Sequence, residues 1–465
     1  MRSAKSGNGK YFGSDTLLVS TASAGSGLGR TSTFPTSETA PASTDDAAYQ
    51  CGLHRALGTQ FIARICAIRC VPHETLQPCW LEQSVSFDCS FVSSFLDRQD
   101  SSSYRDPFCF SWYAGLGVAH KLLKTVIPSL DPKTRYKVTL ISGSTHFFWT
   151  VGAPRAMLSP YPHDLSDSFI SIADGFTQYA EDSFEFVHGQ VAALNTNERT
   201  LSVKLSSEIE QESGGAMTEG FDSLVLAAGG RGPSPLYSIH GSHVSTLEAF
   251  KDLHARTPVA TTILVVGGGS AGTQTAGELG STYGKTKNIT LLSGTDRLLK
   301  NLRPAIGQRR DYDCGHFDHR HGPYTGLFIP AGVPARQPQS IVVDDFPRVL
   351  GAGPRVYALG NIASTSMGGA VDINYMMAVA IANITFDLSD GRTGKAHEQR
   401  YLPFTKETQL VPVGRSKGVG AVFGWWMPSF FVWLIKGRTF TFPNALKTAL
   451  GTVQEAVLAL VSLTG

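Results

Sequence analysis

The pattern of apolar and polar positions changes character about a quarter of the way along the chain. Before residue 107 there is no sustained period of 2 or 3.6 residues, and residues 30–50 are rich in Ser, Thr and Pro. From about residue 113, helical spacing of apolar residues alternates with short apolar runs. We therefore predict a disordered or aberrant segment over residues 1–106 and ordered α/β structure after it.

The ordered part begins with a helix and continues with several strands. In "FCFSWYAGLGVAHKLLK" (108–124), apolar residues recur at Leu116, Ala119 and Leu123, which is typical of a helix. Apolar runs bounded by turn residues predict strands over 136–142, 184–194, 200–205 and 221–230.

The strongest local signal is "TTILVVGGGSAGTQTAGELG" (261–280), a buried strand that runs into a glycine-rich turn and a helix of small residues. Its glycines are Gly267, Gly269 and Gly272. The first allows the turn, the second lets the backbone approach a pyrophosphate, and the third lets the helix pack close to the strand. Because a second strand follows over 288–294, we predict a dinucleotide-binding unit rather than a glycine-rich hairpin.

The end of the second strand bears on the choice of nicotinamide cofactor. NAD-binding units commonly place an acidic residue there, which holds the ribose 2′-hydroxyl. Here the position is Ser293, with Arg297 four residues later. Either these residues accept a 2′-phosphate, so that NADPH is used at least as well as NADH, or Ser293 only ends the strand and Arg297 is solvated.

Composition narrows the possible functions. A chain of 465 residues can form two or three domains, and its net charge of +2 gives no electrostatic case for nucleic acid. None of the seven cysteines forms a C-x-x-C pair, which argues against a disulfide reductase or a zinc ribbon. The Arg2 position excludes the N-myristoylation pattern, and the early basic and hydroxyl residues fit a mitochondrial transit peptide or a plain tail.

Several segments together resemble one family. They are "HFFWTVGAPRAML" (146–158), "LVLAAGG" (224–230), "RVYALGNIAS" (355–364) and "VPVGRSKGVG" (411–420). In this order they are similar to the apoptosis-inducing-factor-like family, specifically the ferroptosis-suppressor type of FAD-dependent NAD(P)H:quinone oxidoreductases and their fungal relatives. The resemblance covers roughly residues 113–308 and 323–440.

The resemblance implies two Rossmann-like dinucleotide-binding domains, with the NAD(P)H domain inserted into the FAD domain, and a small C-terminal domain. On this basis the FAD-binding domain comprises residues 107–258 and 345–400. The NAD(P)H-binding domain, which is shortened, comprises residues 259–344, and the C-terminal domain comprises residues 401–465. The cofactors implied are FAD and NAD(P)H.

The first FAD-binding turn departs from the family pattern. By resemblance, Ala114 and Gly115 belong to the tail of the FAD phosphate loop, with Gly115 as its third glycine. Phe110, Ser111 and Trp112 stand where the family has glycine-rich residues. We expect the first FAD strand to be compromised and FAD to bind weakly, through either a misassigned first exon or natural divergence.

Of the other cofactor-binding positions of the family, this chain keeps some and replaces others. Arg155 matches an arginine near the flavin, and Val191 matches a valine whose backbone meets the adenine. Gly360 begins the second FAD fingerprint, but Asn361 replaces the ribityl-binding aspartate and carries no charge. Gln274, the candidate catalytic position, replaces a glutamate beside the flavin, and an amide cannot relay a proton.

A histidine-rich stretch, "RRDYDCGHFDHRH" (309–321), interrupts the NAD(P)H domain. We interpret it as a charged surface loop rather than a metal site, because no backbone pattern fixes its ligands. Its potential ligands are Asp313, His316, Asp318, His319 and His321.

The resemblance implies hydride transfer from NAD(P)H to flavin and onward reduction of a quinone-like acceptor. The alternative is a catalytically impaired, membrane-associated binding module. The uncharged run Gly418–Ile435, with three tryptophans and flanking Lys417, Lys436 and Arg438, favours a surface-bound element at a membrane over a spanning helix. We therefore expect a cytoplasmic or mitochondrial protein, peripheral on a membrane.

Overall fold

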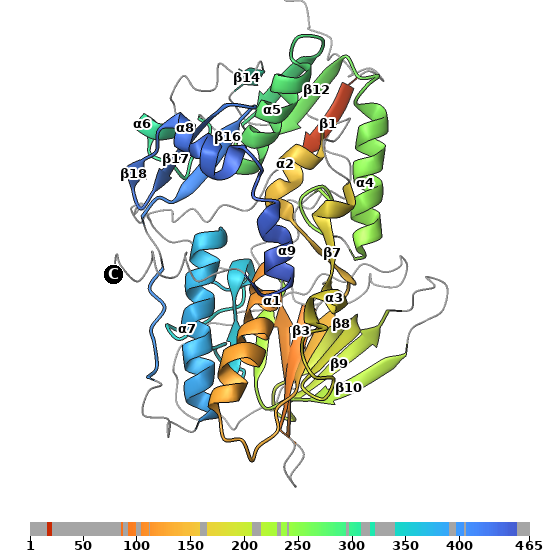
Figure 1. Ribbon diagram of the computed structural model, residues 1–465, viewed down its shortest axis with the longest axis vertical. Coiled ribbons are helices and arrows are strands. Elements are labelled where there is room, and N and C mark those ends of the chain that lie inside the picture. The colour runs from red at the N-terminus through yellow and green to blue at the C-terminus, as the bar shows by residue number, and fades with distance from the viewer. Residues whose placement is uncertain are drawn as a thin grey trace, which may run out of the picture.

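The computed structural model describes most of the chain after residue 111 and four short strands before it. The described ranges are 16–20, 85–86, 92–98, 104–110, 112–158, 165–206, 215–229, 234–239, 241–293, 297–307, 317–320, 340–389, 397–403 and 406–452. They form two bodies stacked along the long axis, each built on its own sheet (Figure 1).

The larger sheet lies in the predicted FAD domain. Its strand order is β10-β9-β8-β5-β3-β4-β11-β15, and β2 pairs with β8. The strands are β2 (Val85–Ser86), β3 (Val92–Arg98), β4 (Tyr104–Phe110), β5 (Val138–Ser142), β8 (Phe184–Asn195), β9 (Thr200–Leu205), β10 (Ala216–Gly220), β11 (Leu224–Ala227) and β15 (Val356–Ala358). The parallel strands β4, β5, β8, β11 and β15 share one carboxyl edge, where ligands of such sheets bind.

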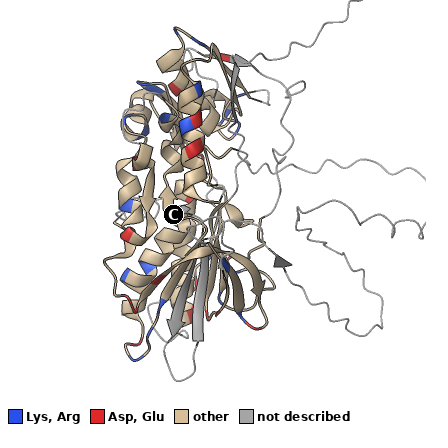
Figure 2. Cartoon of the chain, turned by 90° about the vertical axis from the view of Figure 1, so that its right-hand side faces the viewer, with Lys and Arg blue, Asp and Glu red and all other residues tan. Residues whose placement is uncertain are grey.

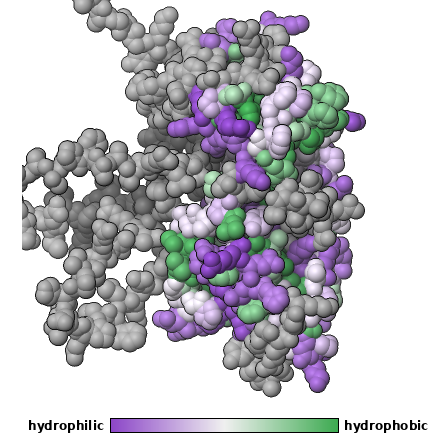
Figure 3. All heavy atoms as spheres, turned by 90° about the vertical axis from the view of Figure 1, so that its left-hand side faces the viewer, coloured by the Kyte–Doolittle hydropathy of each residue, from purple (hydrophilic) through white to green (hydrophobic). Residues whose placement is uncertain are grey.

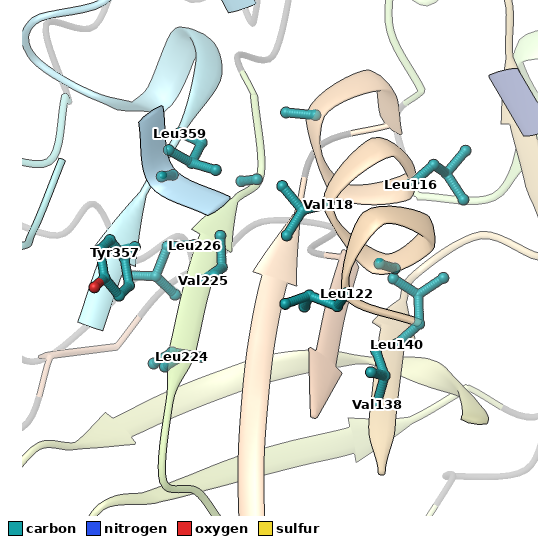
Figure 4. Packing of buried hydrophobic residues seen from close by; sticks show 14 of the residues in the cluster. Leu116, Val118, Leu122, Val138, Leu140, Leu224, Val225, Leu226, Tyr357 and Leu359 are labelled. Atoms are coloured by element: carbon teal, nitrogen blue, oxygen red, sulfur yellow. The ribbon is translucent and has the colours of Figure 1, made fainter. Parts of the chain in front are cut away.

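The core of this domain lies between the sheet and two helices, α1 (Trp112–Lys121) and α7 (Ala370–Leu388). Val118 of α1 and Leu122, the first residue of η1 (Leu122–Val126), lie against the sheet (Figure 4), in one core with Leu140 of β5 and Leu226 of β11. All four are less than a tenth exposed, as the apolar spacing predicts for a helix that covers a fully buried sheet.

The smaller sheet lies in the predicted NAD(P)H domain and is parallel throughout, with the order β1-β12-β13-β14. Its strands are β1 (Thr16–Ser20), β12 (Thr262–Val266), β13 (Asn288–Leu292) and β14 (Asp318–Arg320). The helices beside it are α4 (His243–Arg256), α5 (Ser270–Tyr283) and the single turn α6 (Pro304–Gly307).

Two expectations about the N-terminal segment are corrected by these strands. Residues 1–106 were expected to lie outside both domains, yet β1 pairs with β12, and β2 and β3 join the larger sheet. The first FAD strand, expected to be compromised, is present as β4 between β5 and β11. Strand pairing can tolerate most of the altered residues because the ladder uses backbone groups. Pro107 of β4, which lies opposite Phe95 and Thr139, is the exception, since it has no N–H to donate.

The histidine-rich stretch is also more regular than expected. Asp318 and His319 lie in β14, which pairs with β13, so this part is a strand and not a loop. Asp313, His316 and His321 lie outside the described residues, and within the described ranges no group of acidic, His or Cys side chains could hold a metal ion.

The C-terminal part begins as a meander of β16 (Gln409–Val413), β17 (Lys417–Val422) and β18 (Trp425–Trp426), followed by α8 (Ser429–Val432), η7 (Trp433–Gly437) and α9 (Pro443–Ala449). It was expected to be a separate domain over 401–465. Instead, Val411 and Val419 join the core of the NAD(P)H domain, whereas Ala445 and Ala449 of α9 join the core of the FAD domain.

The run Gly418–Ile435 therefore does not span a membrane, since it divides into strands and short helical turns. Of the helices in the described ranges, α7 alone has the length and apolar composition for a span. It is a core helix: Met376, Ala380 and Ile384 are fully buried, and so is the polar Asn383.

Short elements connect the two bodies. They are β6 (His146–Phe148), α2 (Ala153–Ala156), β7 (Phe169–Ser171) and α3 (Ile172–Phe176). Residues from this region join the NAD(P)H core, among them Phe148, Ala156 and Phe169. Figure 2 shows Lys and Arg interspersed with Asp and Glu over one face of the molecule, without a basic stripe.

Candidate active site

The turn between β12 and α5 has the geometry of a dinucleotide cradle. Gly267 has φ +122°, a conformation that only glycine adopts easily, and its N–H donates to Leu292 O at 2.8 Å. Gly269 precedes the helix without a side-chain cap, and a Cβ built on it would meet no atom within 4 Å. Gly272 follows in the buried first turn. Bare backbone and the helix N-terminus thus face open space, as a pyrophosphate requires.

Ser293 and Arg297, which follow β13, make different contacts in the structure. Ser293 lies at the carboxyl edge and is buried, and a Cβ on Gly268 would stand 2.7 Å from its Cβ. The side chain of Arg297 instead holds its own loop, donating to Leu302 O at 2.6 Å and Lys300 O at 2.8 Å. This geometry does not support a role for Arg297 at a 2′-phosphate, while the role of Ser293 stays a prediction.

Among the buried polar residues of α5, Gln274 and Glu278 lie one turn apart and have the longest side chains. Glu278 is fully buried and forms a bidentate ion pair with Arg155 of α2, Nε–Oε2 2.5 Å and Nη2–Oε1 3.0 Å. Burial raises the pKa of Glu278, and the hydrogen bond and charge of Arg155 oppose that rise. The arginine predicted near the flavin is thus anchored by an acid that the sequence analysis did not single out.

Arg155 also contacts residues 437–440 of the C-terminal segment. Its Nη2 donates to Gly437 O at 2.9 Å, and its guanidinium lies over the Phe440 ring, 4.5 Å from the centroid. Trp149 Nε1 donates to Phe440 O at 3.2 Å. One cation therefore holds α2, α5 and residues 437–440 together.

Gln274 shares an acceptor with a lysine from the far end of the chain. Gln274 Nε2 donates to Leu410 O of β16 at 3.4 Å, and Lys436 Nζ donates to the same oxygen at 3.2 Å. Burial lowers the pKa of Lys436 to about 8. The sequence showed Lys436 only as a flanking charge; its place beside Gln274 depends on folding.

The predicted FAD residues lie at the carboxyl edge of the larger sheet. Ala114 and Gly115 are buried in the first turn of α1, where a third glycine belongs. Gly360 follows β15 with φ +73°, and Asn361 next to it is exposed. Val191 is buried in β8 just beyond the segment that pairs with β5. The structure brings these residues to one edge, and their ligand roles stay predictions.

The connection between β4 and α1 differs from its counterpart in the other domain. Only Ser111 separates β4 from α1, whereas Gly267, Gly268 and Gly269 separate β12 from α5. A shorter connection offers fewer backbone N–H groups to a phosphate. The expected weakness of FAD binding stays a prediction with this structural basis.

Two buried hydroxyls indicate that the site fits its cofactors. Thr365 Oγ1, shortly after Gly360, and Thr273 Oγ1, on the first turn of α5, are buried and have no hydrogen-bond partner within the protein. Buried polar atoms normally have partners, so each is available to a ligand group. Gly369 precedes α7 with φ +84°, and a Cβ there would meet nothing within 4 Å.

Comparison with known proteins agrees with this geometry. The sequence profile of the pyridine nucleotide-disulphide oxidoreductases matches residues 113–312. Oxidoreductase phnG of Penicillium herquei is 30% identical over 389 residues, which cover 70% of this chain and 91% of that protein. The chain belongs to the pyridine nucleotide-disulphide oxidoreductase family. Ferroptosis suppressor protein 1 of Mus musculus is 24% identical over 344 residues, covering 63% of this chain and 87% of that protein.

This oxidoreductase is a member of the branch that resembles ferroptosis suppressor protein 1 and apoptosis-inducing factor, as the sequence motifs predicted. Among solved structures, NDH2 from Plasmodium falciparum in complex with NADH is similar over 74% of this chain and 96% of that chain, with 12% identity and a TM-score of 0.44. FAD and NAD(P)H are the cofactors of this oxidoreductase, and the predicted α/β fold class is confirmed.

Proposed function

We propose that this flavin-dependent NAD(P)H oxidoreductase delivers its electrons to a quinone-like acceptor. One observation carries the proposal: Lys436, whose pKa burial lowers to about 8, donates to Leu410 O, the same backbone oxygen that Gln274 of α5 binds. The resemblance of the motifs to NAD(P)H:quinone oxidoreductases supports the same acceptor class.

The stoichiometry of quinone reduction explains why such a lysine is useful. Conversion of a quinone to a hydroquinone takes up two electrons and two protons, whereas oxidation of NAD(P)H releases two electrons and one proton. One further proton must therefore come from the protein or the solvent. Gln274 cannot supply it, because an amide does not titrate in this range, but Lys436 Nζ can.

The chain's own residues prepare the rest of the site. The β12–α5 turn would hold the pyrophosphate of NAD(P)H, and the edge around Gly360 and Thr365 would hold FAD. FAD, when bound there, would supply the two-electron redox chemistry between NAD(P)H and the acceptor. Arg155 and Glu278 keep α2 and α5 in fixed relation, and Lys436 Nζ holds the proton near Leu410 O.

The acceptor class can be tested with the purified chain supplied with FAD and NADPH. We expect a short-chain, water-soluble quinone to be reduced mole for mole with NADPH oxidation. Oxygen alone should sustain a much slower rate. NADPH oxidation that is indifferent to the quinone would overturn the assignment, and bound flavin without any turnover would favour the impaired binding module.

Lys436→Met tests the proton source. If Lys436 donates the proton, the wild-type kcat should fall as the pH rises through about 8, the pKa of this lysine. The variant should lose that alkaline limb and about 100-fold in kcat, as is typical when a general acid is removed. The pH profile, measured with saturating NADPH and quinone, decides between this role and simple packing.

Lys436→Met should also change the melting temperature, by an amount that depends on pH. The pKa of Lys436 is about 8 in the folded protein and 10.5 in the unfolded chain. Below pH 8 the lysine is charged in both states, and the cost of burying that charge lowers the free energy of unfolding by its full amount. The Met variant should therefore melt at a higher temperature than wild type at pH 7. The difference should shrink between pH 8 and 10.5.

A further inference from the structure

The C-terminal meander and the helical turns after it expose a group of large apolar side chains. Trp425 is 79% exposed and Phe430 is 59% exposed. The set, called here the apolar face, consists of Trp425, Trp426, Phe430, Phe431, Leu434 and Ile435. Figure 3 shows hydrophobic surface in the upper part of the side of the molecule on which α8 and β18 lie in Figure 1. Soluble proteins rarely group exposed aromatic residues without a binding role.

The helical spacing explains why these side chains face outward together. Phe430 and Leu434, and Phe431 and Ile435, are pairs four residues apart, so they share one side of α8–η7. Val432 is fully buried on the opposite side, and a Cβ on Gly418 of β17 would stand 2.4 Å from its Cγ1. The segment is thus anchored by one side and unpartnered on the other, within the described part of the chain.

Basic residues outnumber acidic ones around the apolar face, although Glu407, which pairs with Arg303 Nε at 2.8 Å, lies beside Gly424, the neighbour of Trp425. Residues 408–452 contain no Asp or Glu. They contain five basic residues, Arg415, Lys417, Lys436, Arg438 and Lys447. Trp residues beside Lys and Arg are typical of segments that lie at the headgroup level of a membrane, where anionic lipids attract the cations.

We propose that the apolar face docks on an anionic lipid surface. The α8–η7 segment covers nine residues, a length of about 14 Å, which is too short to cross a hydrocarbon core of about 30 Å. It therefore lies in the interface, with Trp425, Phe430 and Leu434 in the outer acyl region and Lys417 and Arg438 at the headgroups.

The docked orientation brings the lipid close to the proposed acceptor site. η7 bears the exposed Leu434 and Ile435 and, one residue later, Lys436, which meets Gln274 through Leu410 O. A lipid-soluble acceptor would thus reach the protein on the segment that carries the proton. Only this step rests on the proposed function; docking itself does not.

Vesicle co-sedimentation tests the docking. Full-length protein is mixed with vesicles of phosphatidylcholine alone or with 30% phosphatidylserine, a choice that sets a strongly anionic surface. Wild type should pellet with the anionic vesicles and lose binding in high salt. Trp425→Ser/Phe430→Ser should reduce the bound fraction at least tenfold, and Lys417→Glu/Arg438→Glu should abolish the preference for phosphatidylserine.

Val259→Ser is the matched control, because Val259 is 78% exposed on the loop before β12, away from the apolar face. It should pellet like wild type. Equal pelleting of all variants, or none by wild type, would overturn the proposal. So would a wild-type dimer that Trp425→Ser/Phe430→Ser converts to a monomer without vesicle binding. Turnover with a water-soluble quinone, measured without vesicles, separates failure of docking from failure of the acceptor assignment.

Discussion

Gly269→Val should remove NAD(P)H binding while leaving the fold intact. Gly269 has φ −77° and ψ −173°, extended backbone that valine adopts readily, and no atom lies within 4 Å of its Cβ position. The methyl groups would instead fill the space beside the N-terminus of α5, where the pyrophosphate needs bare backbone. We expect the KM for NADPH to rise by about 100-fold, equivalent to about 2.7 kcal/mol of lost binding.

The control is the same substitution at a glycine that also has room. Gly220 ends β10, and the nearest atom to its Cβ position is Arg199 O at 3.9 Å. Gly220→Val should leave both the KM for NADPH and the melting temperature unchanged. An unaltered KM in Gly269→Val would show that the dinucleotide binds elsewhere, and a large drop in its melting temperature would show that the turn is structural.

Glu278→Leu should be the most destabilising of the substitutions proposed for this protein. It leaves Arg155, 7% exposed, as a buried cation without its carboxylate. Removing one partner of a buried ion pair typically costs about 3–5 kcal/mol. We expect a loss of that size in the free energy of unfolding, measured by urea denaturation of the FAD-loaded protein.

Two further variants separate charge burial from other effects. Arg155→Met/Glu278→Leu removes both charges and should recover most of the lost stability, because no unpaired ion remains. Asp252→Leu breaks the exposed pair with Arg256, whose side chains are 64% and 55% exposed, and should cost about 0.5 kcal/mol or less. A double variant as unstable as Glu278→Leu would mean that packing, not charge, dominates.

The parts of the fold encoded by neighbouring residues could be predicted from the sequence. The β12–α5 turn was readable because strand, glycines and helix follow one another within 20 residues, and the structure has the strand and the helix where they were predicted. The binding roles of the three glycines stay predictions. The fully buried strands β5 and β11, and the partly buried strands β8 and β9, were marked by apolar residues bounded by turns. Local periodicity carries such information directly.

The candidate site depended on contacts that no local pattern encodes. Arg155 and Glu278 are 123 positions apart, and Gln274 meets Leu410 O 136 positions away. Glu278 occupies an ordinary position on an apolar helix face, where a buried acid is recognisable only from its partner. The pairing of β1 with β12 could not be predicted either, because backbone hydrogen bonds depend little on which side chains the paired residues carry.

The C-terminal segment is attached to the FAD domain at two separate places. On entry, Tyr401 donates to Asp372 Oδ1 of α7 at 2.5 Å. On exit, α9 packs near α1, where His120 Nε2 bonds Ala449 O and Lys124 Nζ bonds Gly451 O, at 2.8 and 2.9 Å. A body joined through one linker can swing as a hinge, but one fixed at both ends cannot rotate without breaking an attachment. We therefore expect NAD(P)H to enter through small local adjustments rather than domain opening. Crosslinking the C-terminal segment to α1 should then leave turnover largely intact.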